Sequence, residues 1–469
     1  MSTWHAPPAR GPVRGQVRLP GSKSITNRAL VLAALSSGPS VIENPLHARD
    51  TRLAGAALSV LGATVSADAL TTWRLTPGSP APGATLSVDV GNSGTCMRFL
   101  PAVAALTSAS VTFDGDARAR ERPVGALLDA LRAVGADVRG DAAPFTVHGS
   151  GSVRGGSVVL DASGSSQLVS GLLLAAPRFE QGLEVRHSGP PVPSMPHIAM
   201  TTRMLRSCGA VVSTSGGPRP TSWRVSPGPL SLGVLDVEPD LSNAGPFLAA
   251  ALVTGGTLVI EGWRADSLQA SDAILEVFTA MGASCTVGPD GLTVSGTGAV
   301  RGITADLRDV SELAPVLTAC AAVASSPSEF SGIGHMRTHE TDRLAALAKE
   351  INALGGDVTE QPDGLSIRPR PLRSAGPFGT YEDHRMVMAA AVLGLSVPGL
   401  SVAGADTVGK TFPGFMDTWH AMLAGSAMPM GLAEPAGLAE PAGLAELAEP
   451  AEPAGLAELA EPAELEPGP

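Results

Sequence analysis

A glycine that follows a helical pattern recurs along this chain at an almost constant interval. The segments VLGATV, AVGADV, SCGAVV, AMGASC and ALGGDV place it at positions 62, 135, 209, 282 and 355, which are 73, 74, 73 and 73 residues apart. Each glycine ends a helical stretch such as GALLDALRAV and precedes a strand-like segment. This order predicts a helix stopped by a left-handed glycine and followed by a strand. The segment DTWHAMLAGSA, with Gly425, is a candidate sixth copy.

A second set of helical patterns runs in phase with the first. These segments begin near residues 24, 95, 166, 243, 311 and 383, and small apolar residues cover most of their faces, so we expect buried helices. Strand-like segments such as GTLVIEG follow them. The sequence therefore predicts an α/β protein of six units of about 70 residues each. Because this period exceeds that of ordinary solenoids, closed globular packing with three units per domain is favoured.

Composition narrows the class of protein. With 469 residues, 44% of them hydrophobic, the chain can bury a sizeable core and form two or more domains. The last 39 residues carry nine of the 44 acidic residues and none of the 32 Lys and Arg, so the rest of the chain sums to only −3. Such a body has no broad basic surface for nucleic acid. Residues 426–469, rich in Ala, Glu, Pro and Leu, predict a disordered tail.

Neither a membrane segment nor a disulfide framework is indicated. The N-terminal MSTWHAPPARGP lacks an apolar signal core, and no later run of about 18 apolar residues is free of charges and helix breakers. The four cysteines are scattered without a C-x-x-C pair, which is typical of reduced core thiols in a cytosolic protein. We therefore expect a cytoplasmic protein that binds neither membranes nor nucleic acids.

Polar residues gather at the starts of the buried helices, in GSKS, GNSGT, SGSSQ, PDLSN, DVSE and YEDHR. Ser, Asn and Asp at these places can cap free backbone N–H groups, and capping alone remains an alternative for each junction. Capping does not explain the cations in or near the same early turns, because a helix N-terminus disfavours positive charge. These cations are Lys23, Arg98, Arg122, Arg343 and Arg385.

An anion held between the cations and the helix N–H groups would explain them. Arginine forks and a lysine point charge suit phosphate and carboxylate groups. Lys23 is one of only three lysines in the chain, the others being Lys349 and Lys410. Pairing with Glu43, Asp129 or Glu382 is the structural alternative.

Two familiar motifs fail on inspection. LPGSKS lacks the first glycine of a nucleotide-binding P-loop at the required spacing. HETDR begins like H-E-x-x-H but has arginine at the second histidine position, which argues against a zinc site.

Seven segments together resemble the 5-enolpyruvylshikimate-3-phosphate (EPSP) synthase family. They are LPGSKSITNRAL, GNSGTCMRFL, RERPVG, SGSSQLVSGLLLAAP, HETDRL, YEDHRM and GKTFP, in the family's order over about residues 12–420. The resemblance implies transfer of the enolpyruvyl group of phosphoenolpyruvate (PEP) to the 5-hydroxyl of shikimate 3-phosphate. The reaction is an addition–elimination through a tetrahedral intermediate that releases phosphate, and it needs no metal or other cofactor. The resemblance also implies competition between PEP and glyphosate.

The fold implied by the resemblance has two domains of three βαβαββ units each. Residues 1–20 and 238–425 would form domain one, and residues 21–237 would form domain two. We expect a monomer whose partners are its small-molecule substrates.

The resemblance assigns residues as well. Glu340 occupies the position of the proton donor, and Glu312 stands where many members have an aspartate that accepts the hydroxyl proton. Lys23 joins these two as a catalytic residue. The residues matching PEP contacts are Lys23, Gly94, Arg122, Gln167, Arg343, Arg385 and Lys410. Those matching contacts to shikimate 3-phosphate are Lys23, Ser24, Arg28, Ser165, Ser166, Gln167, Ser194, Glu312 and His339.

Three histidines depart from the family's pattern. His339 stands where many members have lysine, His335 where many have asparagine, and His197 where tyrosine is common. A histidine can serve a phosphate group, but its charge depends on pH.

Two alternatives remain open at this point. The first is UDP-N-acetylglucosamine enolpyruvyl transferase, which shares the fold but typically carries a cysteine in the loop that corresponds to residues 116–128, where this chain has none. The second is a non-catalytic module that binds phosphate ligands. The presence of Glu312, Glu340, Lys23 and Lys410 argues against the second.

Overall fold

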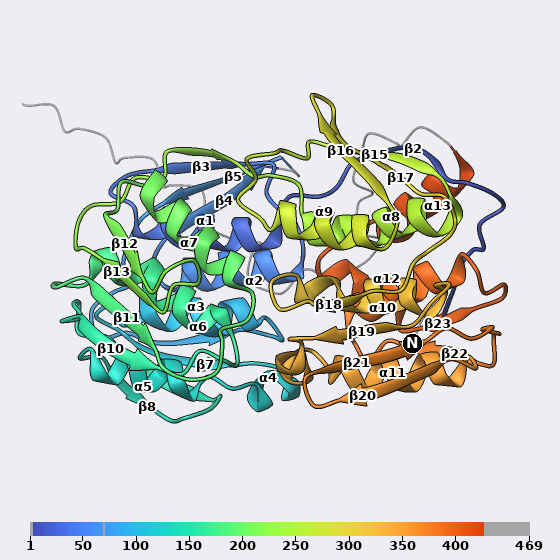
Figure 1. The fold of residues 1–469 in the computed structure, drawn as a ribbon. Helices are drawn as coiled ribbons and strands as arrows, with labels where there is room; N and C mark the ends of the chain where they lie inside the picture. The colour runs from blue at the N-terminus through green and yellow to red at the C-terminus, as the bar shows by residue number, and fades with distance from the viewer. Residues whose placement is uncertain (1–2, 69–70, 426–469) are drawn as a thin grey trace, which may run out of the picture. The chain divides into compact units, whose positions relative to one another are not determined.

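Helices and strands alternate along the chain as the repeat predicts (Figure 1). The structure is a computed structural model, and it describes residues 3–68 and 71–425. The tail predicted for residues 426–469 lies outside the described residues.

One set of helices ends at the repeated glycines. The glycines at 62, 135, 209, 282 and 355 have φ angles between 92° and 111°, a conformation that side chains with a Cβ rarely adopt. The sixth copy ends the same way, at Gly425 with φ 65°. The helices of this set are α2 (Arg49–Val60), α5 (Gly125–Ala133), α7 (Met195–Ser207), α9 (Ser271–Ala280), α11 (Arg343–Ala353) and α13 (Phe415–Ala424).

The second set of helices is buried, as expected from its composition. Every residue of α3, α10 and α12 is buried. Small residues allow this close packing: a Cβ on Gly171 of α6 would lie 2.1 Å from the carbonyl oxygen of Arg98 in α3. The helices of this set are α1 (Lys23–Leu35), α3 (Gly94–Ala104), α6 (Ser166–Ala175), α8 (Leu241–Thr254), α10 (Ala314–Ala322) and α12 (His384–Gly394).

Short helical segments complete the list. They are α4 (Ala117–Glu121) and the 3₁₀ turns η1 (Ala176–Arg178), η2 (Ser311–Leu313), η3 (Gly334–Thr338) and η4 (Ala405–Lys410).

The strands of residues 3–68 and 71–425 form six small sheets, five of them with four strands. Each sheet joins one parallel pair to antiparallel neighbours. In spatial order, three of the sheets are β6 (Thr85–Asp89), β7 (Ser110–Asp114), β9 (Phe145–His148), β8 (Asp137–Arg139); β10 (Gly156–Leu160), β11 (Leu183–His187), β13 (Ser222–Val225), β12 (Val212–Ser215); and β18 (Thr304–Asp306), β19 (Ser328–Ser331), β21 (Gly364–Arg368), β20 (Asp357–Gln361).

Two further sheets each take a strand from a distant part of the chain. They are β14 (Val234–Asp236), β3 (Ser40–Glu43), β5 (Thr72–Thr76), β4 (Thr64–Asp68); and β16 (Ser284–Gly288), β17 (Gly291–Ser295), β15 (Thr257–Glu261), β2 (Arg14–Val17). The two chain segments that supply β2 and β14 meet at a bridge between Gly21 and Pro239.

The last sheet is smaller. The strands β22 (Pro377–Gly379) and β23 (Ser401–Ala403) are parallel, and the N-terminal strand β1 (Thr3–His5) pairs antiparallel with β23. The sixth unit is therefore βαβα within the described residues and takes its third strand from the other end of the chain.

The buried hydrophobic residues fall into two clusters. One contains residues from Ile25 to Val237, and the other contains residues from Trp4 to Leu19 and from Leu241 to Met422. In Figure 1 the elements from α1 to β13 gather on one side, and those from β15 to β23 gather on the other. The expected domain limits at residues 20 and 238 stay a prediction.

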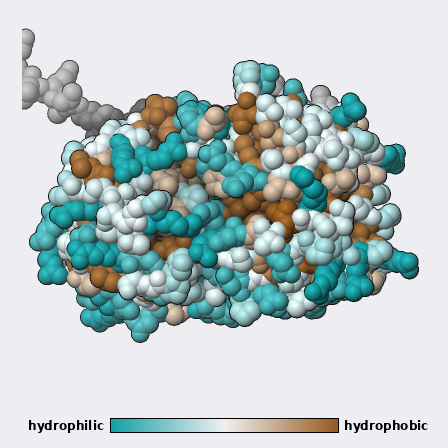
Figure 2. All heavy atoms as spheres, viewed as in Figure 1, coloured by the Kyte–Doolittle hydropathy of each residue, from teal (hydrophilic) through white to brown (hydrophobic). Residues whose placement is uncertain are grey.

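The surface and the thiols complete the description. Figure 2 shows hydrophilic side chains over much of the face drawn, with hydrophobic atoms in patches between them. All four cysteines are free, and Cys96, Cys208 and Cys320 are buried. No helix in the described part of the chain is both long and apolar enough to cross a bilayer.

Candidate active site

The first turns of the buried helices carry both caps and cations. Ser22, Ser93 and Ser165 accept hydrogen bonds from backbone N–H groups of α1, α3 and α6. Asp240 and Asp383 do the same for α8 and α12. Capping and anion binding therefore do not compete as explanations, because the cap residues lie beside the cations and leave them available.

Several of these helix starts border one polar depression, which we call the cationic hollow. It is lined by Lys23, Asp50, Gly94, Thr95, Arg98, Arg122, Gly164, Ser165, Gln167, Glu312, Thr338, His339, Glu340 and His384. Eight of the residues expected at the site from the sequence line it: Lys23, Gly94, Arg122, Ser165, Gln167, Glu312, His339 and Glu340.

Two guanidinium groups approach the backbone at Gly94. A Cβ there would lie 2.4 Å from Arg122 Nη2 and 2.7 Å from Arg98 Nη1, so only glycine leaves both arginines in place. Arg122 donates to the carbonyl oxygen of Asn92 at 3.1 Å, and Arg98 donates to Gln167 Oε1 at 3.0 Å. Burial lowers the pKa of Arg98 to about 9. The buried Nε groups of Arg98 and Arg122 have no hydrogen-bond partner among the described residues.

Glu340 is held between two cations. Its carboxylate lies 2.7 Å from Lys410 Nζ and 3.1 Å from Arg343 Nη2, and its side chain is 8% exposed. Burial raises the pKa of Glu340, but Lys410 and Arg343 outweigh burial and hold this pKa well below its ordinary value. Lys410 Nζ also donates to the carbonyl oxygen of Asn92, at 3.3 Å. Lys410 therefore links the residues just before α3 to Glu340.

Asp383 fixes the position of the Arg343 guanidinium. The guanidinium donates to both oxygens of Asp383, at 2.7 and 3.2 Å, and the two side chains are 1% and 0% exposed. Its remaining N–H groups reach Glu340, His339 and Glu312. A bidentate, buried pair of this kind fixes the orientation of the arginine fork.

The Glu312 carboxylate forms ion pairs with Arg343 and Arg385. Its Oε2 is 3.2 Å from Arg343 Nη1 and 3.5 Å from Arg385 Nε. Burial raises the pKa of Glu312, but the two arginines outweigh burial and hold this pKa well below its ordinary value. The side chain is nonetheless 30% exposed, far more than either arginine.

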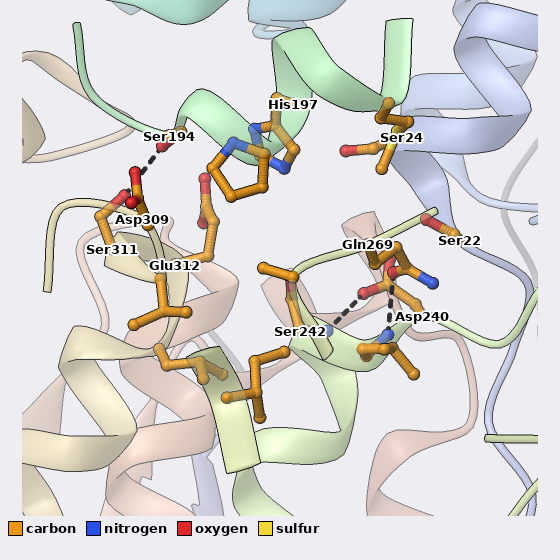
Figure 3. A pocket seen from close by; sticks show the side chains of 17 residues that line it. Ser22, Ser24, Ser194, His197, Asp240, Ser242, Gln269, Asp309, Ser311 and Glu312 are labelled. Atoms are coloured by element: carbon orange, nitrogen blue, oxygen red, sulfur yellow. Dashed lines mark hydrogen bonds between the residues drawn. The ribbon is translucent and has the colours of Figure 1, made fainter. Parts of the chain in front are cut away.

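A second depression, which we call the serine hollow, adjoins Glu312. Figure 3 shows the Glu312 carboxylate turned toward the His197 side of this hollow. Ser194 Oγ lies 3.2 Å from Ser311 Oγ, and His335 Nε2 lies 3.1 Å from the same Ser311 oxygen. The polar side chains that line it are Ser22, Ser24, Ser194, His197, Asp240, Ser242, Gln269, Asp309, Ser311 and Glu312.

The histidines of the site are neutral near pH 7. Burial lowers the pKa of both His197 and His335 to about 4. Burial, followed by Arg343, lowers the pKa of His339 well below its ordinary value. His339 Nδ1 lies 3.2 Å from Arg343 Nη1, and its ring meets the His335 ring edge-on at 5.5 Å.

Five expected residues line neither hollow: Arg28, Ser166, Arg343, Arg385 and Lys410. Arg28 is 2% exposed, and its guanidinium donates to Thr201, Ser170 and two backbone carbonyls. Ser166 is 3% exposed in the first turn of α6. Arg343, Arg385 and Lys410 form ion pairs with the carboxylates of Glu312 and Glu340, which do line the hollows.

Sequence reasoning missed three acidic or basic groups of the site. Asp50, which is 3% exposed, lies 3.6 Å from Lys23 Nζ, where Glu43 was the alternative partner. The buried His384 ring has no hydrogen-bond partner for either nitrogen in the described part of the chain. Asp383 and His384 stand inside the YEDHR segment, which was a usable signal, whereas Asp50 carried none.

No group of three or more His, Cys, Asp or Glu side chains suited to a metal ion occurs within residues 3–68 and 71–425.

Comparison with known proteins gives a consistent result. The sequence model of the family described as EPSP synthase (3-phosphoshikimate 1-carboxyvinyltransferase) matches residues 8–419. Two solved structures of EPSP synthase from Acinetobacter baumannii resemble the chain with TM-scores of 0.75 and 0.74 at 24% identity. Each comparison covers 90% of this chain and 98% of the other, which shows a shared two-domain fold. The family match over nearly the whole length shows that the chain belongs to the EPSP synthase family, whose activity is the 3-phosphoshikimate 1-carboxyvinyl transfer of the shikimate pathway.

Proposed function

We propose that the two hollows form one substrate site, in which the cationic hollow holds PEP and the serine hollow holds shikimate 3-phosphate. The observation that carries this proposal is the pair of carboxylates on Arg343, where Glu340 faces one hollow and Glu312 borders both. The reaction needs a general acid for the methylene carbon of PEP and a general base for the hydroxyl that attacks the neighbouring carbon, and two carboxylates held by one arginine support these roles.

The anions of PEP bind to fixed cations. Lys23 and Arg122 line the cationic hollow. Lys410 pairs with the lining residue Glu340, and Arg343 and Arg385 pair with Glu312, which lines both hollows. The N–H groups of α3 near Gly94 add partial positive charge. Ser24, Ser165, Ser194, Gln167 and His339 remain the predicted contacts of shikimate 3-phosphate, together with Arg28 and Ser166.

The first chemical step is an addition. Glu340 gives a proton to the methylene carbon of PEP, and the 5-hydroxyl oxygen bonds to the neighbouring carbon while Glu312 takes the hydroxyl proton. Each positioned acid or base contributes roughly 10²- to 10⁴-fold. Glu340 must be protonated to act, and its contact with Lys410 opposes this. Because the PEP phosphate neutralises Lys410, substrate binding raises the pKa of Glu340.

The second step is an elimination. The C–O bond to phosphate breaks, the methyl group of the intermediate returns a proton to Glu340, and the enolpyruvyl ether forms. The departing phosphate needs a proton or a compact positive charge. Lys23 provides it as a compact ammonium with three rotatable N–H donors, whereas the planar guanidinium of arginine spreads its charge over a wider group.

We also propose the domain limits, the compartment and the oligomeric state. Residues 1–20 with 238–425, and residues 21–237, form the two domains; the division of the buried hydrophobic residues into two clusters supports these limits. The protein acts as a cytoplasmic monomer on small molecules and binds no nucleic acid, which the near-neutral body of the chain supports.

The variant Glu340→Gln tests the acid. Turnover should fall by roughly 10²- to 10⁴-fold, because the amide cannot donate or regain the proton. Calorimetry should still detect binding of both substrates. The exposed Glu276 of α9 supplies the control, since Glu276→Gln makes the same chemical change outside the site. Near-wild-type turnover by Glu340→Gln would remove Glu340 from the mechanism.

A further inference from the structure

Glu312 is shared by the two hollows. It is the one residue that lines both of these depressions. Its carboxylate lies within 3.5 Å of both Arg343 and Arg385, which are the arginines proposed to hold PEP. An acidic side chain of the protein therefore occupies cations that the proposed function reserves for a substrate anion.

The two arginines are fixed in place. Arg343 is 1% exposed and is held by both oxygens of Asp383. Arg385 is 5% exposed, and its Nη1 donates to the carbonyl oxygen of Ser242 at 2.9 Å. An incoming anion meets a preformed pair and does not have to assemble it.

Glu312 holds the two arginines less firmly than Asp383 holds Arg343. The buried Nε of Arg385 has no hydrogen-bond partner among the residues described, because Glu312 at 3.5 Å makes an ion pair without hydrogen-bond geometry. Glu312 is also the exposed member of the group, at 30%, and borders open space on the serine-hollow side. It is the partner that can leave.

We propose that Glu312 is an internal competitor for the Arg343–Arg385 pair, and that PEP displaces it on binding. The proposal rests on the proposed function, which supplies the identity of the anion. Displacement has a useful consequence. The carboxylate, which already faces the His197 side of the serine hollow, leaves the arginines and moves further into that hollow, where the 5-hydroxyl of shikimate 3-phosphate is proposed to lie. PEP binding thus frees the base from its ion pairs with the two arginines.

The length of the glutamate side chain makes the proposal testable. Glu312→Asp keeps the charge and the acid–base chemistry but shortens the side chain by one bond of about 1.5 Å. From the present 3.2 and 3.5 Å, aspartate would lie beyond hydrogen-bond distance of both arginines. The competitor is then removed while the net charge of the site stays the same.

The experiment is calorimetric titration with PEP alone. Glu312→Asp should lower the dissociation constant about two- to fivefold, the effect of losing a partly exposed ion pair. Glu312→Gln should also bind PEP more tightly, yet turn over at least roughly 10²-fold more slowly because the base is gone. The control Glu276→Asp, on the exposed face of α9, should change neither quantity.

Unchanged or weaker PEP binding by Glu312→Asp would overturn the proposal, since charge alone would then explain any effect of Glu312→Gln. If Glu276→Asp tightened PEP binding as much as Glu312→Asp does, the proposal would be overturned as well, because the effect would not come from the arginine pair. Phosphate release by the wild-type protein is measured separately. Its absence would contradict the proposed function, and the dissociation constants would still decide whether Glu312 competes with PEP.

Discussion

At the scale of single residues, two of the three lysines lie among the proposed anion-binding groups. Lys23 pairs with Asp50, and Lys410 pairs with Glu340. The third, Lys349, lies with its Nζ 5.4 Å from the centre of the Tyr381 ring. Arginine supplies nearly all the other positive charges of the chain. Lysine stands at the two positions where a compact charge fits between an acidic side chain and the start of a helix.

Lys23→Arg should keep the charge and the fold but reduce turnover at least roughly 10²-fold. The guanidinium would not place its charge where Lys23 Nζ lies, 3.6 Å from Asp50, and it cannot give up a proton during elimination. The measurement is the rate of phosphate release, with thermal unfolding as the check on folding. Lys349→Arg is the matched control and should stay active. A Lys23→Arg variant with nearly full turnover would show that any cation suffices.

Gly94→Ala should weaken PEP binding. The new Cβ would lie 2.4 Å from Arg122 Nη2 and 2.7 Å from Arg98 Nη1, so both guanidinium groups must move. We expect the KM for PEP to rise about tenfold, with a smaller change in kcat, because displaced binding groups cost ground-state and transition-state binding alike. Gly38→Ala, where a Cβ meets nothing within 4 Å, is the control. An unchanged KM would place PEP away from Gly94.

At the scale of elements, local signals predicted most of the helices. A cap residue followed by an apolar run located α1, α3, α6 and α12 to within one residue, since both signals are carried by neighbouring positions. The helix expected from residue 311 begins instead at Ala314 after the 3₁₀ turn η2. Pro315 lies in the first turn of α10, where its missing N–H is tolerated.

Partners that are far apart in sequence could not be predicted. Arg28 donates to Thr201, 173 residues away, and to Ser170, 142 residues away. Four hydrogen bonds hold its guanidinium inside the fold, and its contact with shikimate 3-phosphate stays a prediction. Asp50 likewise entered the site only through the packing of α2 beside α1.

Folding stability should depend on the half-buried histidines His197 of α7 and His335 of η3. The pKa of His197 and of His335 is about 4 in the folded chain and near 6.5 in the unfolded chain. Between these values the unfolded state binds more protons, so stability is full above pH 6.5 and is lost as pH falls toward 4. Glu312 and Glu340, whose pKa values are depressed, add a further loss below about pH 4.5.

Urea unfolding at pH 7.5 and pH 5.0 measures this dependence. We expect the free energy of unfolding to fall by roughly 1 to 2 kcal/mol per histidine over that interval, after allowance for solvent screening. His197→Gln should reduce the fall, whereas a change at the exposed His5 should not. Equal unfolding free energies at the two pH values would contradict this reasoning.

At the scale of the whole molecule, the repeat predicted the six-unit architecture but not how its ends are joined. Strand β1 completes the sheet of β22 and β23, and β2 and β14 are exchanged between units, because strand pairing depends on tertiary contacts. The site also depends on contacts between distant parts of the chain, since Lys410 donates a hydrogen bond to the carbonyl oxygen of Asn92, 318 residues away. The family resemblance grouped Lys410 with Gly94 and Arg122 among the expected PEP contacts, whereas residue spacing alone did not.

The central claim is that this site transfers the enolpyruvyl group of PEP to shikimate 3-phosphate. The most direct test is phosphate release from PEP by the full chain, with shikimate 3-phosphate or UDP-N-acetylglucosamine as the acceptor. We predict release that requires shikimate 3-phosphate and yields the enolpyruvyl ether in equal amount. Release that requires UDP-N-acetylglucosamine instead, or tight binding of both substrates without release, would contradict the account.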